Sequence, residues 1–384
     1  MNPVIIPNID PIPLPAPVWL LQSLLYLTFI LHIFPMNLIL GGGLVAVALA
    51  VLGRSPARGR YARLARQLAA VLPVAVAAAV TLGVAALLFL QVLYGPLYYT
   101  ATVLIALPWI SVIGLLIVGY YAYYYFGLRR SAGNTPPIWA GILASLVFLC
   151  IAFLYANMAT LMIRPEKFAG MHGLGTHGIL LNTNEPMLWP RYLHFIVGAI
   201  AVTSLLVMIV GLVQRRRDED YGNWAVQLGG ILFVAATVAQ MIIGVWQLLM
   251  LRTDVMMRFL GEDTAAMLTL GGAIFLALAA IILILVAALG RARLGMTIAG
   301  IIALVGTIKL MVIVRGIVRT GYLGSNYVMA DQPVRAQWLL IAIFFILLLA
   351  GLALVVWMLH AVIARRGMPS APSQTTTPGS ATGA

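Results

Sequence analysis

The chain has 384 residues, of which 63% are hydrophobic and only 9% are charged, with a formal net charge of +13. This composition excludes an ordinary soluble domain, because apolar runs longer than ~18 residues recur along the chain and each is long enough to cross a bilayer. The single cysteine, Cys150, excludes a disulfide framework, a Cys-x-x-Cys zinc site and a covalent Cys-x-x-Cys-His haem motif. Because the arginines gather in short loops between the apolar runs, the positive charge indicates a membrane protein and no nucleic-acid partner.

Nine membrane-spanning helices are predicted from the apolar runs, so the expected fold class is an all-α polytopic membrane protein. Every second loop is rich in arginine, for example the loops at 54–66 and 215–217, whereas the alternate loops mix acidic and basic residues. Arginine-rich loops face the cytoplasm, so nine helices place the N-terminus outside and the C-terminus in the cytoplasm. The predicted helices cover residues 18–52, 65–93, 98–128, 137–163, 190–214, 223–251, 264–290, 294–320 and 335–364.

The two ends of the chain differ in composition from this nine-helix domain at 18–366. Residues 1–17 are rich in proline and predict a stiff segment on the outer surface, and residues 367–384 predict a disordered cytoplasmic tail rich in Pro, Ser, Thr and Gly. A weak internal repeat pairs Leu31-His32-Ile33 with Leu193-His194-Phe195, and residues 89–93 with 245–249. The repeat predicts two four-helix bundles followed by a ninth helix.

Polar side chains inside the predicted helices are few, and they are candidates for a ligand site. A buried histidine in lipid-facing protein is costly unless some group binds it. No acidic residue lies in a predicted helix core, which argues against a proton pump, because such proteins use membrane-embedded carboxylates. The polar residues in question are His32, His194, Lys309, Arg315 and Arg319.

His194 and Met311 are predicted to meet in the outer half of the membrane. Met311 lies ~14 Å from the outer end of its helix at ~1.5 Å per residue, and His194 lies about one turn inside its own. Histidine and methionine form an axial pair for a low-spin haem. Arg191 and Arg315 lie one turn further out on the same faces, where they would bind the haem propionates. The alternatives are a methionine that fills the core, arginines that snorkel to the interface, and a histidine bonded to a loop carbonyl.

Four short motifs follow one another in a specific order along the chain. They are Thr28 to Pro35 (TFILHIFP), Gly83 to Gly95 with Gln91, Arg191 to Phe195 (RYLHF), and Lys309-Leu310-Met311. This order resembles helices one, two, five and eight of subunit I of the cytochrome bd superfamily, and the resemblance covers most of the nine helices. It implies that His32 ligates a haem at the oxygen-reducing end, that His194 and Met311 ligate a low-spin haem b, and that Lys309 replaces the arginine of an Arg-x-Met motif. It also implies a multi-pass protein of a bacterial or archaeal inner (cytoplasmic) membrane.

Several departures from that family bear on function. Its oxidases carry glutamates in the third and ninth helices, a long quinol-binding loop between helices six and seven, and a Gly-Arg-Gln-Pro-Trp signature. Here the third and ninth predicted helices contain no glutamate, the loop spans only 252–263, and the signature is missing. Oxygen reduction to water consumes protons, and no carboxylate route supplies them. The chain is therefore interpreted as a divergent, oxidase-related member that binds haem b, with one to three haems.

The sixth ligand of a haem on His32 stays open at this point. The internal repeat places the counterpart of Met311 near Asn157, Met158 or Met162, so Met158 is one candidate. A five-coordinate haem that binds a gas is another possibility. The third is a histidine that is simply bonded to a helix carbonyl.

The position of the family's quinol loop holds a mixed cluster of Arg252, Asp254, Arg258 and Glu262. These side chains are candidates for a proton acceptor and a carbonyl anchor at a quinol site. Ion pairing at the surface is the alternative.

Three functions are compatible with the sequence. The first is a haem b-binding electron-transfer subunit of a respiratory complex, passing electrons between the quinol pool and an outer-side (periplasmic) partner such as a cytochrome c. Its complex would be a quinol- or cytochrome c-linked oxidoreductase. The second is a terminal oxygen or nitric oxide reductase subunit with an open haem at His32, and the third is a cofactor-free transporter or scaffold. The expected partners are quinone or quinol, an outer-side redox subunit and membrane lipid.

Overall fold

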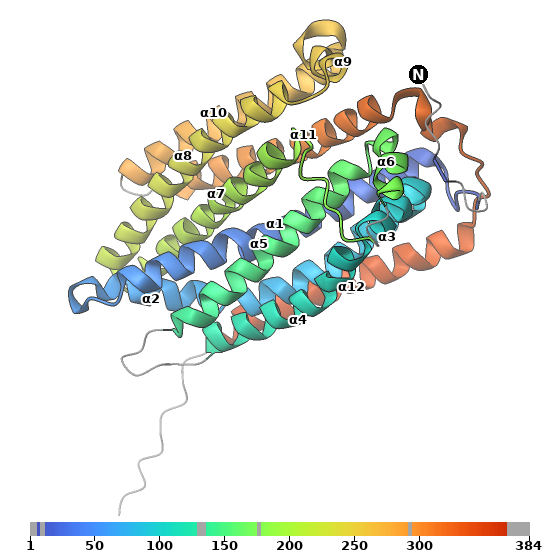
Figure 1. The fold of residues 1–384 in the computed structure, drawn as a ribbon. Coiled ribbons are helices and arrows are strands. Elements are labelled where there is room, and N and C mark those ends of the chain that lie inside the picture. Colours follow the sequence, from blue (N-terminus) through green and yellow to red (C-terminus); the bar gives the residue numbers. More distant parts are fainter. Residues whose placement is uncertain (1–5, 8–11, 129–135, 175–177, 291–293, 367–384) are drawn as a thin grey trace, which may run out of the picture. The chain divides into compact units, whose positions relative to one another are not determined.

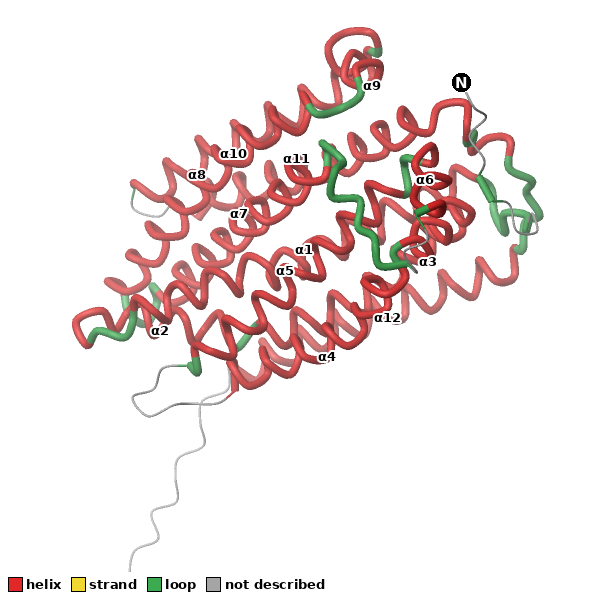
Figure 2. The backbone as a smooth tube through the Cα atoms, viewed as in Figure 1, coloured by secondary structure: helices red, strands yellow, loops and turns green. Residues whose placement is uncertain are grey.

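The computed structural model of the chain describes residues 6–7, 12–128, 136–174, 178–290 and 294–366. Within these ranges the chain is almost wholly helical (Figures 1 and 2). Its α-helices are α1 (Val18–Leu52), α2 (Gly59–Ala69), α3 (Leu72–Leu104), α4 (Ala106–Leu128), α5 (Ile138–Leu161), α6 (Phe168–Gly173), α7 (Leu188–Gln214), α8 (Glu219–Leu249), α9 (Thr253–Met257), α10 (Thr264–Leu289), α11 (Leu294–Leu323) and α12 (Trp338–Arg366).

Long apolar helices dominate the described residues. Eight of these helices, α1, α3, α4, α5, α7, α8, α10 and α11, are long and apolar enough to cross a membrane. A ninth apolar stretch, Trp338–Leu354 within α12, is shorter. Helices satisfy their own backbone hydrogen bonds, which is the condition for crossing a bilayer. The chain is therefore a multi-pass membrane protein, while the count of nine spans and the sides of the two termini stay predictions.

The second and third predicted helices differ from those observed. The sequence predicts a helix end before Gly95-Pro96, but α3 only kinks there, with Tyr94 at φ −128° and ψ 30°, and continues to Leu104. Proline lacks an amide hydrogen and kinks a helix without always ending it. The chain turns instead at Ile105, which has φ −112° and ψ 36°. The predicted start at residue 65 also merged α3 with the separate helix α2.

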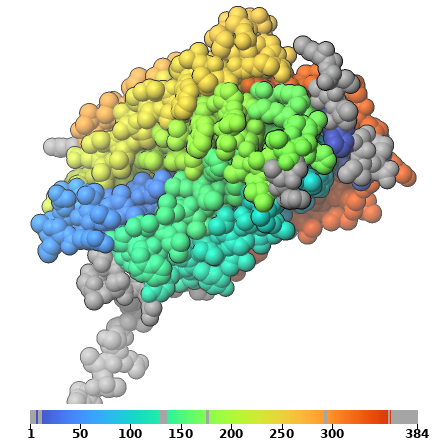
Figure 3. Space-filling model, viewed as in Figure 1, coloured from blue at the N-terminus to red at the C-terminus, as the bar shows by residue number. Residues whose placement is uncertain are grey.

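The spanning helices pack as two groups of four. Buried residues of α1, α2, α3, α4 and α5 form most of one core, which also takes in Ala199, Val207 and Tyr221 from α7 and α8, and buried residues of α7, α8, α10 and α11 form another. The groups meet chiefly where α1 packs on α7. Figure 3 shows the two groups side by side on one face, in blue to green and in yellow-green to yellow. This arrangement agrees with the two bundles that the internal repeat predicts.

A glycine run in α1 permits this close packing. A Cβ atom on Gly41 would overlap the backbone of Ala199 in α7, and a Cβ atom on Gly43 would overlap the hydroxyl of Tyr123 in α4. The Tyr123 hydroxyl donates a hydrogen bond of 2.9 Å to the carbonyl of Ile39. Small residues let helix backbones approach in membranes, so this run fixes α1 as the centre of the first core.

The chain divides into two compact units. One comprises residues 1–12 and 18–333, and the other comprises Pro13–Pro17 with Val334–Ala384. Within the second unit, Leu14 forms a parallel bridge with Val334, and the amide of Arg335 donates a 2.8 Å hydrogen bond to the Leu14 carbonyl. The proline-rich segment before α1 therefore pairs with the segment before α12. The tail predicted at 367–384 lies outside the described residues.

Candidate functional site

A cavity of about 320 Å³ lies among α1, α3, α4, α5, α7 and α11. Its wall is mostly apolar, as in most small-molecule sites. The side chains that carry chemistry are His32, Met158, Arg191, Arg315 and Arg319, with Tyr26 and Tyr155. The cavity therefore brings together five residues that the sequence singles out, His32, Met158, Arg191, Arg315 and Arg319, from helices far apart in the chain.

His32 in α1 is held against α3 in one orientation. Its Nδ1 lies 2.9 Å from the carbonyl oxygen of Ala79. A carbonyl accepts only, so in the neutral imidazole Nδ1 carries the proton and Nε2 keeps its lone pair. The ring lies against Gly83, where a Cβ atom would come within 2.7 Å of Cε1. The expected helix-carbonyl bond of His32 is thus present, and it leaves Nε2 free to act as a ligand.

Three arginines line the same cavity without a counter-charge. Arg191 and Arg319 are each 7% exposed, and Arg315 has a buried Nε atom with no hydrogen-bond partner. Among the described residues, none of the three has a carboxylate partner. Arg315 lies 4.5 Å from the ring of Phe29, and Arg319 lies 4.7 Å from that of Tyr94. Buried charges without a partner are strongly destabilising, so this wall is built for an anionic ligand.

Met158 reaches the cavity from α5. Its side chain is 1% exposed, and the last turn of α5 also buries Asn157 and Thr160 completely. Met158 and Met36 both bring a thioether to the cavity lining, and His32 brings an imidazole. Met158 and His32 therefore share one cavity, as the repeat-based expectation for Met158 requires.

His194 in α7 has surroundings like those of His32. Its ring lies against Gly244 of α8, where a Cβ atom would come within 3.3 Å of Cε1. Nδ1 lies near the backbone of Gln240, one turn before Gly244, but it is buried without a hydrogen bond of ordinary geometry. In α3, Ala79, whose carbonyl bonds His32, likewise lies one turn before Gly83. Each four-helix group thus packs a histidine of its first helix on a glycine of its second.

This correspondence changes the alignment of the repeat. The sequence pairs Gln91 with Gln247, whereas the histidine contacts pair Gly83 with Gly244 and leave the two glutamines out of register. Gln91 is partly buried and lies beside Tyr98. It does not line the cavity.

The arrangement predicted around His194 and Met311 is only partly assembled. Arg191 and Arg315, expected beside that pair, line the His32 cavity, and neither His194 nor Met311 does. Arg315 lies 5.9 Å from the ring of Phe195, the residue after His194. The Arg315 side chain, one turn beyond Met311, therefore reaches α7 at the residue that follows His194. Lys309 is exposed on α11.

The mixed cluster at 252–263 forms a structural clamp. Arg252 pairs with both carboxylate oxygens of Asp254 at 2.5 and 2.7 Å and donates to the Gly321 carbonyl at 2.9 Å. This pairing raises the pKa of Arg252 and lowers that of Asp254. Arg258 and Glu262 begin and end a π-helical turn at Arg258–Glu262. Ion pairing, the alternative to quinol binding, is what the structure shows for Arg252 and Asp254.

Sequence reasoning missed some of the residues that build the site. Arg319 was among the candidate polar residues, but it was given no role at a haem, although it follows Arg315 by four residues and so shares its face. Ala79 and Gly83 have no sequence signal as partners of His32, because only packing brings α3 there. Outside the cavity lining, sequence reasoning also missed Glu185, a 1% exposed carboxylate in the loop before α7 that pairs with Lys167 at 2.7 Å and Arg164 at 3.2 Å.

In the described part of the chain, no three His, Cys, Asp or Glu side chains gather as a metal site. The cavity offers the imidazole of His32 and the thioether of Met158 as single donor groups. Single imidazole and thioether groups are the usual axial ligands of haem.

Comparison with known proteins gives a likeness in structure but not in sequence. No family model matches the sequence, and no curated protein matches it. Among solved structures, the chain is similar to a bd oxidase from Geobacillus thermodenitrificans, with a TM-score of 0.68 and 13% sequence identity. The match covers 93% of this chain and 100% of that chain. The chain therefore has a bd-oxidase-like fold.

Proposed function

We propose that this chain is a haem b-binding electron-transfer subunit of a respiratory membrane complex. The observation that supports this most is the cavity lined by His32, whose Nε2 is free, and by three arginines that have no carboxylate partner in the described part of the chain. An imidazole ligand and an excess of buried positive charge are what a haem with two propionates requires. The name of the structurally similar protein, a bd oxidase, agrees with a respiratory setting.

In this proposal, His32 holds the haem through Nε2, and Arg191, Arg315 and Arg319 bind the propionates. The Ala79 carbonyl keeps the proton of His32 on Nδ1, which strengthens Nε2 as a ligand. Gly83, which has no Cβ atom, leaves the space that the His32 ring occupies. Met158 is the candidate for the sixth ligand. Once bound, haem b supplies reversible one-electron transfer at a potential set by its axial ligands and burial.

A second haem is proposed at His194, with Met311 as the other axial ligand. The support is the matching environment of His194 and His32, together with the contact of Arg315 with Phe195. The buried, unbonded Nδ1 of His194 and the unbonded Oε1 of Gln240 are polar atoms without partners near this position. A buried polar atom without a partner is destabilising, and a modest rearrangement on ligand binding would relieve both.

Electrons are proposed to pass between a quinol pool and an outer-side partner such as a cytochrome c. Nine spans, an outer N-terminus, a cytoplasmic C-terminus and an inner-membrane location in a bacterium or archaeon belong to the same proposal. The role of Lys309 in place of the family's arginine stays a prediction. The quinol-site roles of Arg258 and Glu262 also stay predictions. The terminal-reductase reading and the cofactor-free transporter are the competing functions.

The test is the reduced-minus-oxidised visible spectrum of the purified chain, with His32→Ala and His194→Ala. Each substitution should remove part of the haem signal, and together they should remove all of it. The control is His172→Ala, because His172 is exposed in α6. A chain without a Soret band when purified with haem available would overturn the proposal and leave the transporter reading.

A further inference from the structure

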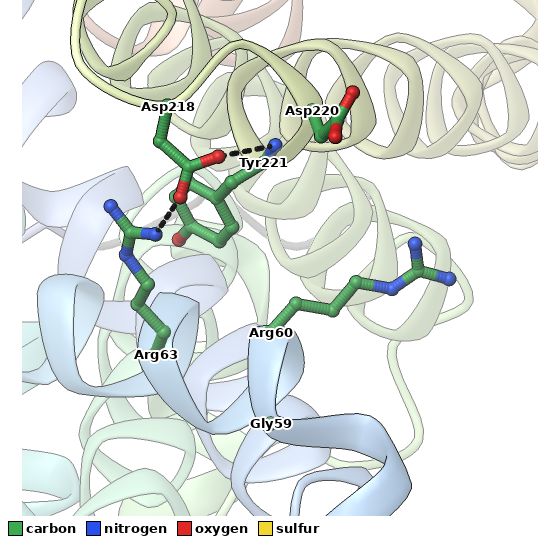
Figure 4. A pocket seen from close by; sticks show the side chains of 6 residues that line it. All are labelled: Gly59, Arg60, Arg63, Asp218, Asp220 and Tyr221. Carbon is green, nitrogen blue, oxygen red and sulfur yellow. Dashed lines mark hydrogen bonds and ion pairs between the residues drawn. The ribbon is translucent and has the colours of Figure 1, made fainter.

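A second pocket, of about 410 Å³, lies between α2 and the start of α8 at the arginine-rich end of the helices (Figure 4). Its walls are Gly59, Arg60, Arg63, Asp218, Asp220 and Tyr221. The helix α2 turns its small and leucine residues, Leu64 and Leu68 among them, into the first core. Arg60 and Arg63 of α2 lie on the other side of the helix and line the pocket.

Aromatic rings lie in and beside this pocket, near the first turns of α2 and α8. Tyr61 and Trp224 pack edge to face at 4.9 Å, and the guanidinium of Arg60 lies 4.9 Å from the Trp224 ring. Arg63 lies 3.8 Å from the ring of Tyr221. Tyrosine and tryptophan gather at the membrane–water interface, beside the phospholipid headgroups. The pocket is therefore at the depth of a lipid headgroup.

Four charged side chains line the pocket, and they form two pairs. In the closed pair the two charges bind each other, and in the open pair neither charge has an ion-pair partner in the part of the chain that the structure describes. Arg63 binds Asp218 at 2.5 Å and Gln214 at 3.3 Å, and Asp218 also accepts the amide of Tyr221 at 3.1 Å. This leaves Arg60 and Asp220, neither of which has an ion-pair partner among the described residues. Figure 4 shows the Arg60 guanidinium standing apart from the Arg63–Asp218 pair. The open pair is one cation and one anion lining a single pocket.

We propose that this pocket binds the zwitterionic headgroup of a phospholipid that carries a phosphodiester and a primary ammonium group. Arg60 binds the phosphodiester, and the ammonium donates hydrogen bonds to the carboxylate of Asp220. An anionic headgroup without an amine would meet Asp220 as a like charge. A trimethylammonium headgroup carries the positive charge but has no N–H to donate. The pocket thus selects a phosphoethanolamine headgroup, whether or not the chain binds haem.

The experiment titrates the full-length chain, purified in detergent, with phosphatidylethanolamine, phosphatidylcholine and phosphatidylglycerol of identical acyl chains, and reads bound lipid by native mass spectrometry. The wild-type chain should bind phosphatidylethanolamine most tightly. Arg60→Gln should weaken phosphatidylethanolamine and phosphatidylglycerol alike, by about fivefold, the usual effect of one charge contact at a membrane surface. Asp220→Asn should abolish the preference for phosphatidylethanolamine over phosphatidylglycerol.

Two matched controls are Arg217→Gln and Glu219→Gln, which remove exposed charges of the same signs from residues outside the pocket lining. Neither should change the preference. Equal binding of the three lipids by the wild-type chain would refute the proposal, and so would an equal effect of the controls. The last titration uses soluble phosphoethanolamine, which has the same headgroup but no acyl chains. Binding as tight as that of the lipid would show a site for a small soluble ligand and would overturn the assignment to a lipid.

Discussion

At the scale of single residues, His32 and Gly83 define the candidate site together. The imidazole is fixed by one hydrogen bond to Ala79 and by one glycine that leaves room for the ring. A side chain at position 83 would displace the ring, because its first carbon would come within 2.7 Å of Cε1.

Gly83→Ala should therefore lower the haem content per chain without unfolding the protein. The closest contact of the added carbon is the His32 ring, so this ring must shift and Nε2 loses its position. The measurement is the haem-to-protein ratio, together with far-ultraviolet circular dichroism. Gly114→Ala is the control, because a Cβ atom there has no neighbour within 4 Å. Equal haem in both variants would remove the role assigned to Gly83.

Met158→Leu should separate a six-coordinate from a five-coordinate haem at His32. Leucine conserves the volume of this buried side chain at a stability cost below about 1.5 kcal/mol, but it has no sulfur ligand. If Met158 is the sixth ligand, the reduced variant binds carbon monoxide and the wild-type chain does not bind it at this haem. Carbon monoxide binding by both would instead favour the gas-binding, terminal-reductase reading.

At the scale of elements, the ion pair between Arg63 and Asp218 joins α2 to the start of α8. Asp218 also caps α8, since its carboxylate accepts the amide of Tyr221. The hydrogen bond from Arg63 lowers the pKa of Asp218 below its ordinary value. The junction therefore depends on an ionised carboxylate.

Asp218→Asn should lower the thermal stability of the detergent-solubilised chain at neutral pH. Because the folded pKa is lowered, the ionised Asp218 stabilises the fold above its unfolded pKa of about 3.9, and this stabilisation disappears as the pH falls through the folded pKa. The difference in Tm between wild type and variant should thus be constant from about pH 7 to pH 5 and shrink below about pH 4. A difference that grows in acid contradicts this assignment. Asp220→Asn in lipid-free detergent should show no such pH dependence.

At the scale of the whole molecule, the membrane topology follows from which ends of the helices carry arginine. The loops at 53–58 and 215–218 lie at one end of their helices, and the segments at 162–174, 178–187 and 250–263 lie at the other. Both sets fit the predicted outer N-terminus if the arginine-rich end is cytoplasmic.

Single cysteines in a Cys150→Ser background should report this topology. Arg217→Cys should react with a membrane-impermeant maleimide only after the membrane is opened, and Asn184→Cys should react in intact cells. Both residues are exposed, so access depends on the side of the membrane and not on burial. The opposite pattern would invert the proposed orientation and place the candidate quinol cluster in the cytoplasm.

The sequence alone determined the class of protein and most of its helices, because length and apolar composition suffice to mark a membrane span. It also identified His32, Met158, Arg191 and Arg315, since polar groups are rare in such helices and therefore stand out. Only the tertiary structure decided which of them share a cavity. The sequence placed both arginines beside His194, whereas packing places them at the cavity of His32. Helix rotation depends on contacts between helices, such as Gly83 with His32, and no local pattern encodes these contacts.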